Sequence, residues 1–139
     1  MFYILVIFSV FVSAYAQIDS RPVVHLPPAV SEFVKQVSAD CLKEIKAEPE
    51  VAKRFFGWQF DEDEISKKFR YCLCLKTNYL DEDNHLNDGF IKLFDSSDRK
   101  EDVQKVLETC NKIKKKDPLD TLFEIALCFY KNSPVLLLP

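Results

Sequence analysis

Apolar side chains recur at helical spacing over most of this chain, and few stretches alternate in the way of a half-buried strand. The clearest example is the stretch 28–47, where apolar residues follow an i, i+3, i+4, i+7 pattern and charged residues occupy the opposite face. Those apolar residues are Val30, Phe33, Val34, Val37, Cys41, Leu42 and Ile45. The interval 50–117 contains no proline, the strongest helix breaker. The pattern therefore predicts an all-α fold.

Six helices are predicted from this pattern, and together they form a compact domain. Their approximate ranges are 28–47, 50–56, 61–78, 88–94, 99–115 and 118–131. The third helix has an apolar stripe made by Ile65, Phe69, Cys72 and Leu73. The last helix is apolar around most of its circumference, so we expect it to be the central element, surrounded by the others.

The first sixteen residues, MFYILVIFSVFVSAYA, carry no charged side chain. The apolar run 2–12 is too short to span a bilayer and leads to Ala14-Tyr15-Ala16, with small residues at the two positions that a signal peptidase reads. Residues 1–16 are therefore predicted to be a signal peptide and residues 17–139 a single helical ligand-binding domain. The expected localisation is secreted and extracellular, without stable membrane insertion.

The net charge of the chain is −3, and the only basic run is "KIKKK" at 112–116. This balance argues against nucleic acid as a partner and against a polybasic surface for membranes. The basic run is interpreted as the solvated last turn of a helix, where cations are favourable.

Catalytic and metal-binding motifs find little support. The histidines, His25 and His85, lie outside any nucleophile motif. The turn "DEDNHLNDG" starts like a calcium loop, but Leu86 stands where that loop needs glycine. Cys72 and Cys74 diverge by about 200° on a helix, which is unsuitable for a metal or redox pair. We expect no enzyme, no cofactor and no metal. His85 is either a solvated loop residue or a group at a cavity mouth whose protonation near pH 6 loosens the fourth helix.

Five cysteines in a secreted chain predict two disulfides and one cysteine left over. The fifth and sixth helices form a hairpin about Asp117-Pro118, which brings Cys110 and Cys128 to similar heights and makes their bond geometrically reasonable. Cys41 would then pair with the third helix, through either Cys72 or Cys74. The spacing of these residues alone leaves that choice open.

Two segments resemble a known family. "RYCLC" places three residues between Arg70 and Cys74, and "DPLDTLFEIALC" places eight between Leu119 and Cys128. The same gaps separate the second from the third and the fifth from the sixth cysteine in insect odorant-binding proteins of the pheromone-binding and general odorant-binding superfamily. "LDEDNHLN" and "CFYKNSP" are also similar to segments of this family. The resemblance covers essentially all of residues 17–139.

The resemblance implies a disulfide pattern. The family joins its first to its third, second to fifth and fourth to sixth cysteine. Mapped onto this chain, two of these bonds are Cys41–Cys74 and Cys110–Cys128. Arg70 and Leu119 would stand at the positions of the third bond, and this paired loss resembles the Minus-C subgroup. Cys72 fits no family position and is expected to be a free thiol on the inward face.

The functional prediction is an apolar cavity bounded by inward-facing residues. The tail "VLLLP" resembles the C-terminal segment that covers or enters the cavity in some family members, and Tyr130 would supply a hydroxyl. The predicted ligand-binding residues are Phe56, Trp58, Phe69, Cys72, Leu73, Phe90, Phe94, Leu107, Phe123, Leu127, Tyr130, Val135 and Leu136.

These features predict a secreted carrier that binds small hydrophobic molecules. The resemblance implies odorants, pheromones or lipid-like molecules as ligands and a chemosensory receptor as a partner, and the domain is expected to be a monomer or a weak homodimer. The alternative is a secreted helical interaction protein with a solid core. A saposin-like lipid module is a third class, but its cysteine spacing differs.

Overall fold

The computed structural model describes residues 19–139, so the predicted signal peptide lies outside the described residues. The predicted all-α class and the six helices are confirmed. In order, the elements are β1 (Val23–His25), α1 (Pro28–Ile45), α2 (Pro49–Phe56), α3 (Glu64–Lys76), α4 (Asp88–Ile91), the 3₁₀ turn η1 (Lys92–Phe94), α5 (Lys100–Cys110), α6 (Pro118–Asn132) and β2 (Leu136–Leu138). Within this part of the chain, no helix is long and apolar enough to cross a membrane.

Local sequence signals set the helix boundaries. Pro28 begins α1, because its fixed φ suits the first helical turn, and Pro118 begins α6 in the same way. The carboxylate of Asp63 accepts a hydrogen bond from the backbone N–H of Ser66 at 3.1 Å and so caps the start of α3. Lys46 adopts a left-handed φ of 55° and ends α1.

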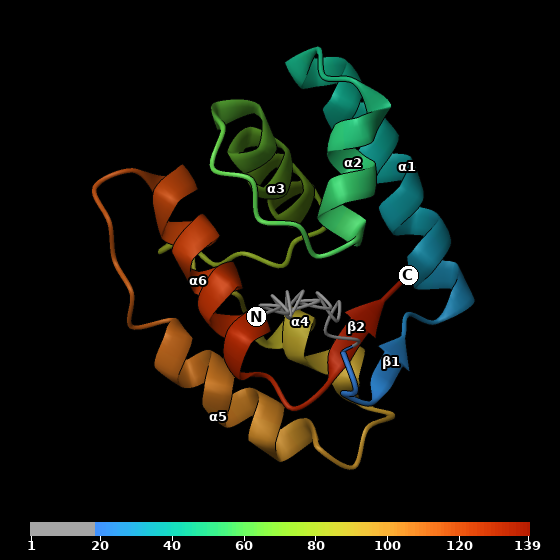
Figure 1. The fold of residues 1–139 in the computed structure, drawn as a ribbon, viewed down its shortest axis with the longest axis vertical. Coiled ribbons are helices and arrows are strands. Elements are labelled where there is room, and N and C mark those ends of the chain that lie inside the picture. The colour runs from blue at the N-terminus through green and yellow to red at the C-terminus, as the bar shows by residue number, and fades with distance from the viewer. Residues whose placement is uncertain (1–18) are drawn as a thin grey trace, which may run out of the picture.

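Helix α3 lies between α1 and α2 on one side and α6 on the other (Figure 1). On each of these sides its side chains contribute to an apolar core. The first core joins α3 to α1 and α2, and its buried members are Val34, Val37, Cys41, Val51, Phe69 and Leu73. The second core joins α4, α5 and α6 to the tail, and its fully buried members include Phe94, Val103, Leu122, Ile125, Phe129 and Val135. Because α3 has partners on two sides, its residues cannot be assigned to a single inward face.

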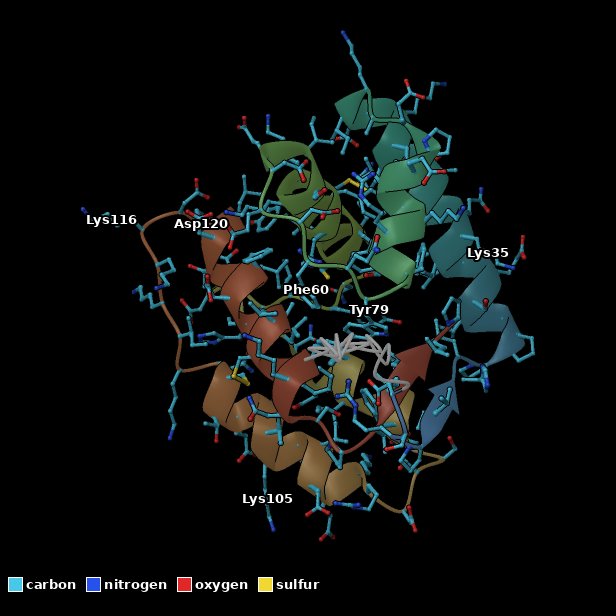
Figure 2. The ribbon with its side chains drawn as sticks, in the orientation of Figure 1. Lys35, Phe60, Tyr79, Lys105, Lys116 and Asp120 are labelled. Carbon is cyan, nitrogen blue, oxygen red and sulfur yellow. A yellow bond between two sulfur atoms is a disulfide. The ribbon has the colours of Figure 1, made fainter. Side chains whose placement is uncertain are left out.

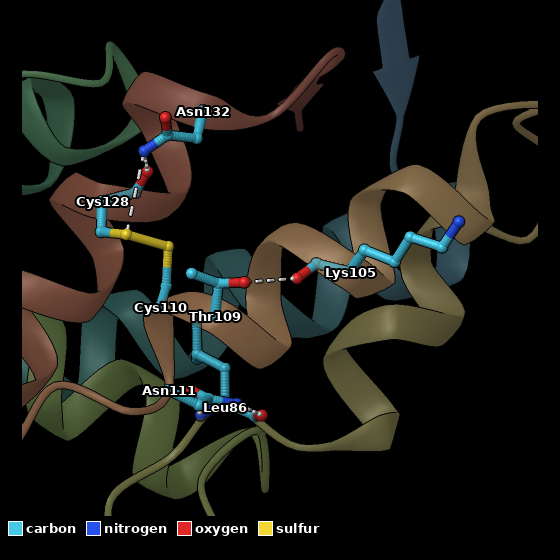
Figure 3. The surroundings of a disulfide bond; sticks show 7 residues. All are labelled: Leu86, Lys105, Thr109, Cys110, Asn111, Cys128 and Asn132. Carbon is cyan, nitrogen blue, oxygen red and sulfur yellow. Dashed lines mark hydrogen bonds between the residues drawn. A yellow bond between two sulfur atoms is a disulfide. The ribbon is translucent and has the colours of Figure 1, made fainter.

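Helix α5 ends at Cys110, five residues before the predicted end. The side chain of Asn111 accepts a hydrogen bond from the backbone N–H of Leu86 at 3.2 Å and donates one to the backbone oxygen of Leu86 at 2.9 Å (Figure 3). This paired contact ties the chain to the segment before α4 and turns it out of the helix. The basic run 112–116 therefore follows α5, and its predicted place in a last helical turn was wrong.

Two short strands at the ends of the described chain were not predicted. Strand β1 pairs in parallel with β2, with Val24 opposite Leu137. Further backbone bonds run from Leu26 N–H to the oxygen of Leu138 and from Leu136 N–H to the oxygen of Pro22, both at 2.9 Å. The "VLLLP" tail is thus held against the fold by backbone hydrogen bonds, with Val135 buried and Leu136–Leu138 half-buried.

Candidate ligand-binding site

Two adjoining cavities, each partly open, lie between the helices and the C-terminal tail, with volumes of about 100 and 50 Å³. They share four wall residues, Phe55, Trp58, Cys74 and Phe90. Figure 2 places Phe60, from the second cavity, and Tyr79, from the first, in the middle of the molecule, whereas the labelled lysines extend outward.

The first cavity is almost wholly apolar. Its lining comprises Leu26, Val34, Phe55, Phe56, Trp58, Leu73, Cys74, Thr77, Tyr79, Phe90, Leu93, Leu137, Leu138 and Pro139. The hydroxyl of Thr77 already donates to the backbone oxygen of Leu73 at 2.6 Å. The other hydroxyl belongs to Tyr79, whose pKa is raised by burial and which therefore remains neutral. A guest in this cavity would meet hydrocarbon and aromatic surface on nearly every side.

The C-terminal tail forms one wall of the first cavity. The indole Nε1–H of Trp58 donates to the backbone oxygen of Leu137 at 2.8 Å, which fixes β2 against the loop after α2. The Trp58 ring stacks on Tyr130, with centroids 5.3 Å apart and planes at 14°. On α6, Tyr130 is in turn covered by the guanidinium of Arg21, 4.7 Å from the ring centroid. Trp58 therefore joins α6, the tail and the cavity.

The second cavity contains one charged group. Its lining comprises Phe55, Trp58, Phe60, Arg70, Cys74, Leu86, Phe90, Leu122, Ala126 and Phe129. Arg70 projects from α3 and is 4% exposed. Its guanidinium carbon lies 4.7 Å from the ring centroid of Phe60 and 5.4 Å from those of Phe55 and Phe123. Burial lowers the pKa of Arg70 from its ordinary value.

The two cysteines of α3 have roles opposite to those predicted. Cys41 is bonded to Cys72, and Cys74 is the free cysteine, so the expected Cys41–Cys74 bond was wrong. Cys72 faces the core shared with α1, whereas Cys74, about 200° around the helix, faces α4 to α6. Cys74 lines both cavities, and burial raises the pKa of its thiol to about 12. The predicted bond between Cys110 and Cys128 is present.

The observed bond of Cys72 also changes the position at which the family spacing predicts the second cysteine. Counted back from Cys72, the three-residue gap leads to Lys68 and no longer to Arg70. Lys68 is exposed and pairs with Glu64 at 3.3 Å. Nearby, the Nζ of Lys67 donates to a carboxylate oxygen of Asp120 at 2.8 Å and so links α3 to α6.

The predicted ligand-binding residues are divided between the cavities and the solid cores. Phe56, Trp58, Leu73 and Phe90 line one or both cavities. The residues buried away from the cavity walls are Phe69, Phe94, Leu107, Phe123 and Val135. Cys72 is in a disulfide, Leu136 is in β2, Tyr130 lies behind Trp58, and Leu127 is half-buried on α6. A helical stripe identifies buried positions, but it does not tell which of them border a void.

Several cavity residues were missed. Leu137, Leu138 and Pro139 follow the predicted tail residues directly, and extending that prediction to the whole tail would have found them. Arg70 precedes Cys74 by four positions and shares its face of α3. No sequence signal pointed to Arg70, because Cys74 on the same face was predicted to be in a disulfide and not in a cavity wall.

The polar residues Asp81, Asp83 and His85 of the turn before α4 lie apart from the cavity walls, although Leu86 of the same turn lines the second cavity. Single ligand atoms of Asp81, Asp83 and His85 lie within 4.8 Å of one another. The carboxylate of Asp81 accepts the backbone N–H groups of Asp83 and His85, at 2.8 and 3.0 Å, and so shapes the turn. His85 Nδ1 is 3.2 Å from Asp81, and His85 lines neither cavity.

The fold is shared with solved odorant-binding proteins. Odorant-binding protein dmelOBP28a from Drosophila melanogaster aligns with a TM-score of 0.65 at 16% identity, over 75% of this chain and 92% of the other. The fatty acid binding protein OBP56a from the oral disk of the blowfly Phormia regina gives 0.64 at 25% identity, over 77% and 94%. Odorant binding protein 5 of Apis mellifera gives 0.62 at 15%, over 76% and 90%.

The similarity extends to the sequence. Residues 24–132 match the sequence profile of the PBP/GOBP family, and the chain belongs to this family. No curated protein sequence gives a significant match.

Proposed function

We propose that this protein is a secreted carrier that binds small hydrophobic molecules in its two adjoining cavities. The observation that carries this proposal is the first cavity, whose walls are apolar apart from two hydroxyls. Binding sites for small molecules are typically concave and mostly apolar, with a few polar groups. The family and its neighbours support the same class, since one neighbour is an odorant-binding protein and another a fatty acid binding protein.

The size of the cavities indicates how a ligand would enter. Volumes of about 100 and 50 Å³ are below the range of roughly 300–1,000 Å³ typical of ligand pockets. A ligand therefore needs wall residues to move. The tail is the best candidate, because β2 is held by a single neighbouring strand and by the bond from Trp58 to Leu137. Displacement of β2 would enlarge the first cavity and open it further.

The proposal also covers the chemistry of the site, the disulfides, the location of the protein and its partners. The carrier does no chemistry on its ligand: the thiol of Cys74, with a pKa of about 12, is protonated at neutral pH and is a poor nucleophile. Two disulfides fit the Minus-C pattern, in which one of three bridges is missing, and an extracellular location. We also propose that a chemosensory receptor is a partner of this protein and that the protein is a monomer or a weak homodimer.

Uptake of a hydrophobic naphthylamine fluorophore tests the proposed function. The protein at micromolar concentration should take up the dye saturably, in a 1:1 ratio, with a blue shift of its emission. Leu93→Phe, which adds bulk to the wall of the first cavity, should weaken dye binding at least fivefold. The matched control Leu75→Phe adds the same bulk at a position that is 55% exposed and should leave it unchanged.

The small cavities favour one second candidate, an interaction protein with a solid core. Absence of saturable dye uptake by the wild-type protein would support that candidate and contradict the carrier. If Leu93→Phe and Leu75→Phe change dye binding equally, the dye binds on the surface, and this result would also contradict the carrier function.

A further inference from the structure

Arg70 is a buried cation without an anionic partner. It is 4% exposed, and its Nη1 has no hydrogen-bond partner among the described residues. Within the same part of the chain no carboxylate forms an ion pair with it. The nearby carboxylate of Asp61 is engaged by the Nε–H of Arg54, at 2.6 Å. A buried charge is normally paired and hydrogen-bonded, so this arrangement is incomplete.

The aromatic rings around Arg70 stabilise its positive charge but do not accept conventional hydrogen bonds from its guanidinium. The rings of Phe55, Phe60 and Phe123 offer their π-electrons to the cation. Phenylalanine rings carry no hydrogen-bond acceptor oxygen, so the buried Nη1 of the guanidinium remains without a hydrogen-bond partner. The rings thus hold the guanidinium in place without neutralising it.

The position of Arg70 indicates what would complete the site. Arg70 lines the second cavity, which shares four wall residues with the apolar first cavity. A molecule that fits both must have an anionic end near Arg70 and a hydrocarbon body. The planar fork of a guanidinium matches a carboxylate, which it can bind with two parallel hydrogen bonds.

We propose that Arg70 binds the carboxylate of an aliphatic carboxylic acid whose hydrocarbon chain occupies the first cavity. This inference rests on the proposed carrier function and specifies its ligand class. Arg70 then acts as the specificity-determining residue: it favours the acid over the alcohol or ester of the same chain length. The desolvated site strengthens this preference, because the carboxylate meets a charge there that water does not screen.

Competition for the bound naphthylamine dye separates this inference from the carrier function. At pH 8, decanoic acid should displace the dye from the wild-type protein at least tenfold more strongly than decan-1-ol or methyl decanoate. Arg70→Met, which keeps length and apolar bulk, should lose at least tenfold more affinity for the acid than for the alcohol or the dye. Arg99→Met, which removes an exposed arginine of the helix start beside Asp102, is the matched control and should behave as wild type.

The possible outcomes are distinguishable. Dye uptake with equal displacement by acid and alcohol would overturn the role of Arg70 and leave the carrier function standing. A parallel loss of acid, alcohol and dye binding in a folded Arg70→Met protein would show a purely structural arginine. If that variant does not fold, ¹⁵N NMR of the wild-type protein decides: decanoic acid, and not decan-1-ol, should shift the Arg70 side-chain N–H resonances, and equal shifts with both would overturn the proposal.

Discussion

At the scale of single residues, Cys72 and Cys74 face opposite sides of α3: Cys72 is bonded to Cys41, whereas Cys74 is a free thiol in the wall of both cavities. The helical hairpin about Pro118 was sufficient to pair Cys110 with Cys128. The partner of Cys41 could not be predicted from helix geometry in the same way. Helix α3 packs against cores on two sides, and one of its two cysteines faces each side. The spacing typical of the family selected Cys74, and the geometry of this chain selected Cys72.

Alkylation tests the assignment of the free cysteine. In the folded protein, iodoacetamide at pH 8 should label Cys74 slowly, because the thiol is buried and its pKa is about 12. In urea without a reductant the pKa returns toward its ordinary value of 9.0, and Cys74 should be labelled quickly. Peptide mass spectrometry identifies the site. A label on Cys72, or a linked peptide that contains Cys41 and Cys74, would contradict the assignment.

The same thiol makes stability depend on pH. Its pKa lies above the ordinary value of 9.0 in the folded state, so the stability from the neutral thiol is full below about pH 9 and is lost as the pH rises toward 12. Between pH 7 and pH 10 the free energy of unfolding should fall by about 1.4 kcal/mol more in the wild-type protein than in Cys74→Ala. Urea unfolding at both pH values measures this difference. Parallel curves for the two proteins would show that Cys74 titrates normally.

At the scale of elements, the helices were predicted and the strands were not. Helical periodicity is local and is repeated over many residues, so α1, α3 and α6 were clear from the sequence. Strands β1 and β2 have three residues each and lie at opposite ends of the described chain. Segments this short carry no readable alternation, and their pairing depends on the helices that bring them together. The end of α5 depended likewise on a distant partner, the backbone of Leu86.

Removal of the tail tests its role as a movable wall. A protein that ends at Val135 keeps that buried residue but loses Leu137, Leu138 and Pro139 from the first cavity. Its dye off-rate in stopped flow should rise about tenfold, equivalent to about 1.4 kcal/mol of lost contact.

Trp58→Phe is the matched partial variant for the tail. It retains an aromatic ring but removes the hydrogen bond to Leu137, so it should give a smaller increase in the off-rate. An unchanged off-rate in both variants would show that the ligand leaves by another route.

At the scale of the whole molecule, each disulfide stabilises one of the two cores. Cys41–Cys72 connects α1 to α3 and Cys110–Cys128 connects α5 to α6, with sequence separations of 31 and 18 residues. Both connections restrict the unfolded chain, and the longer loop restricts it more. Only the first borders the helices that line the first cavity.

Removing the disulfides one at a time should therefore separate stability from binding. Cys41→Ala/Cys72→Ala and Cys110→Ala/Cys128→Ala should each lower the free energy of unfolding by about 2–5 kcal/mol. Dye affinity, measured where both variants are folded, should fall at least threefold more in the first variant, because α1 and α3 supply Val34 and Leu73 to the cavity wall. A larger loss in the second variant would contradict this division of the molecule.

The parallel pairing of β1 with β2 has a consequence for the order of assembly. During synthesis, Val23–His25 emerges before the helices of the described residues, but its partner, Leu136–Leu138, emerges after all of them. Loop-closure entropy makes a contact of such long sequence separation slow to form. The helices can therefore pack first, and the cavity stays open on the side of β2 until the tail arrives. A hydrophobic molecule present at that time could be enclosed without any later displacement of the tail.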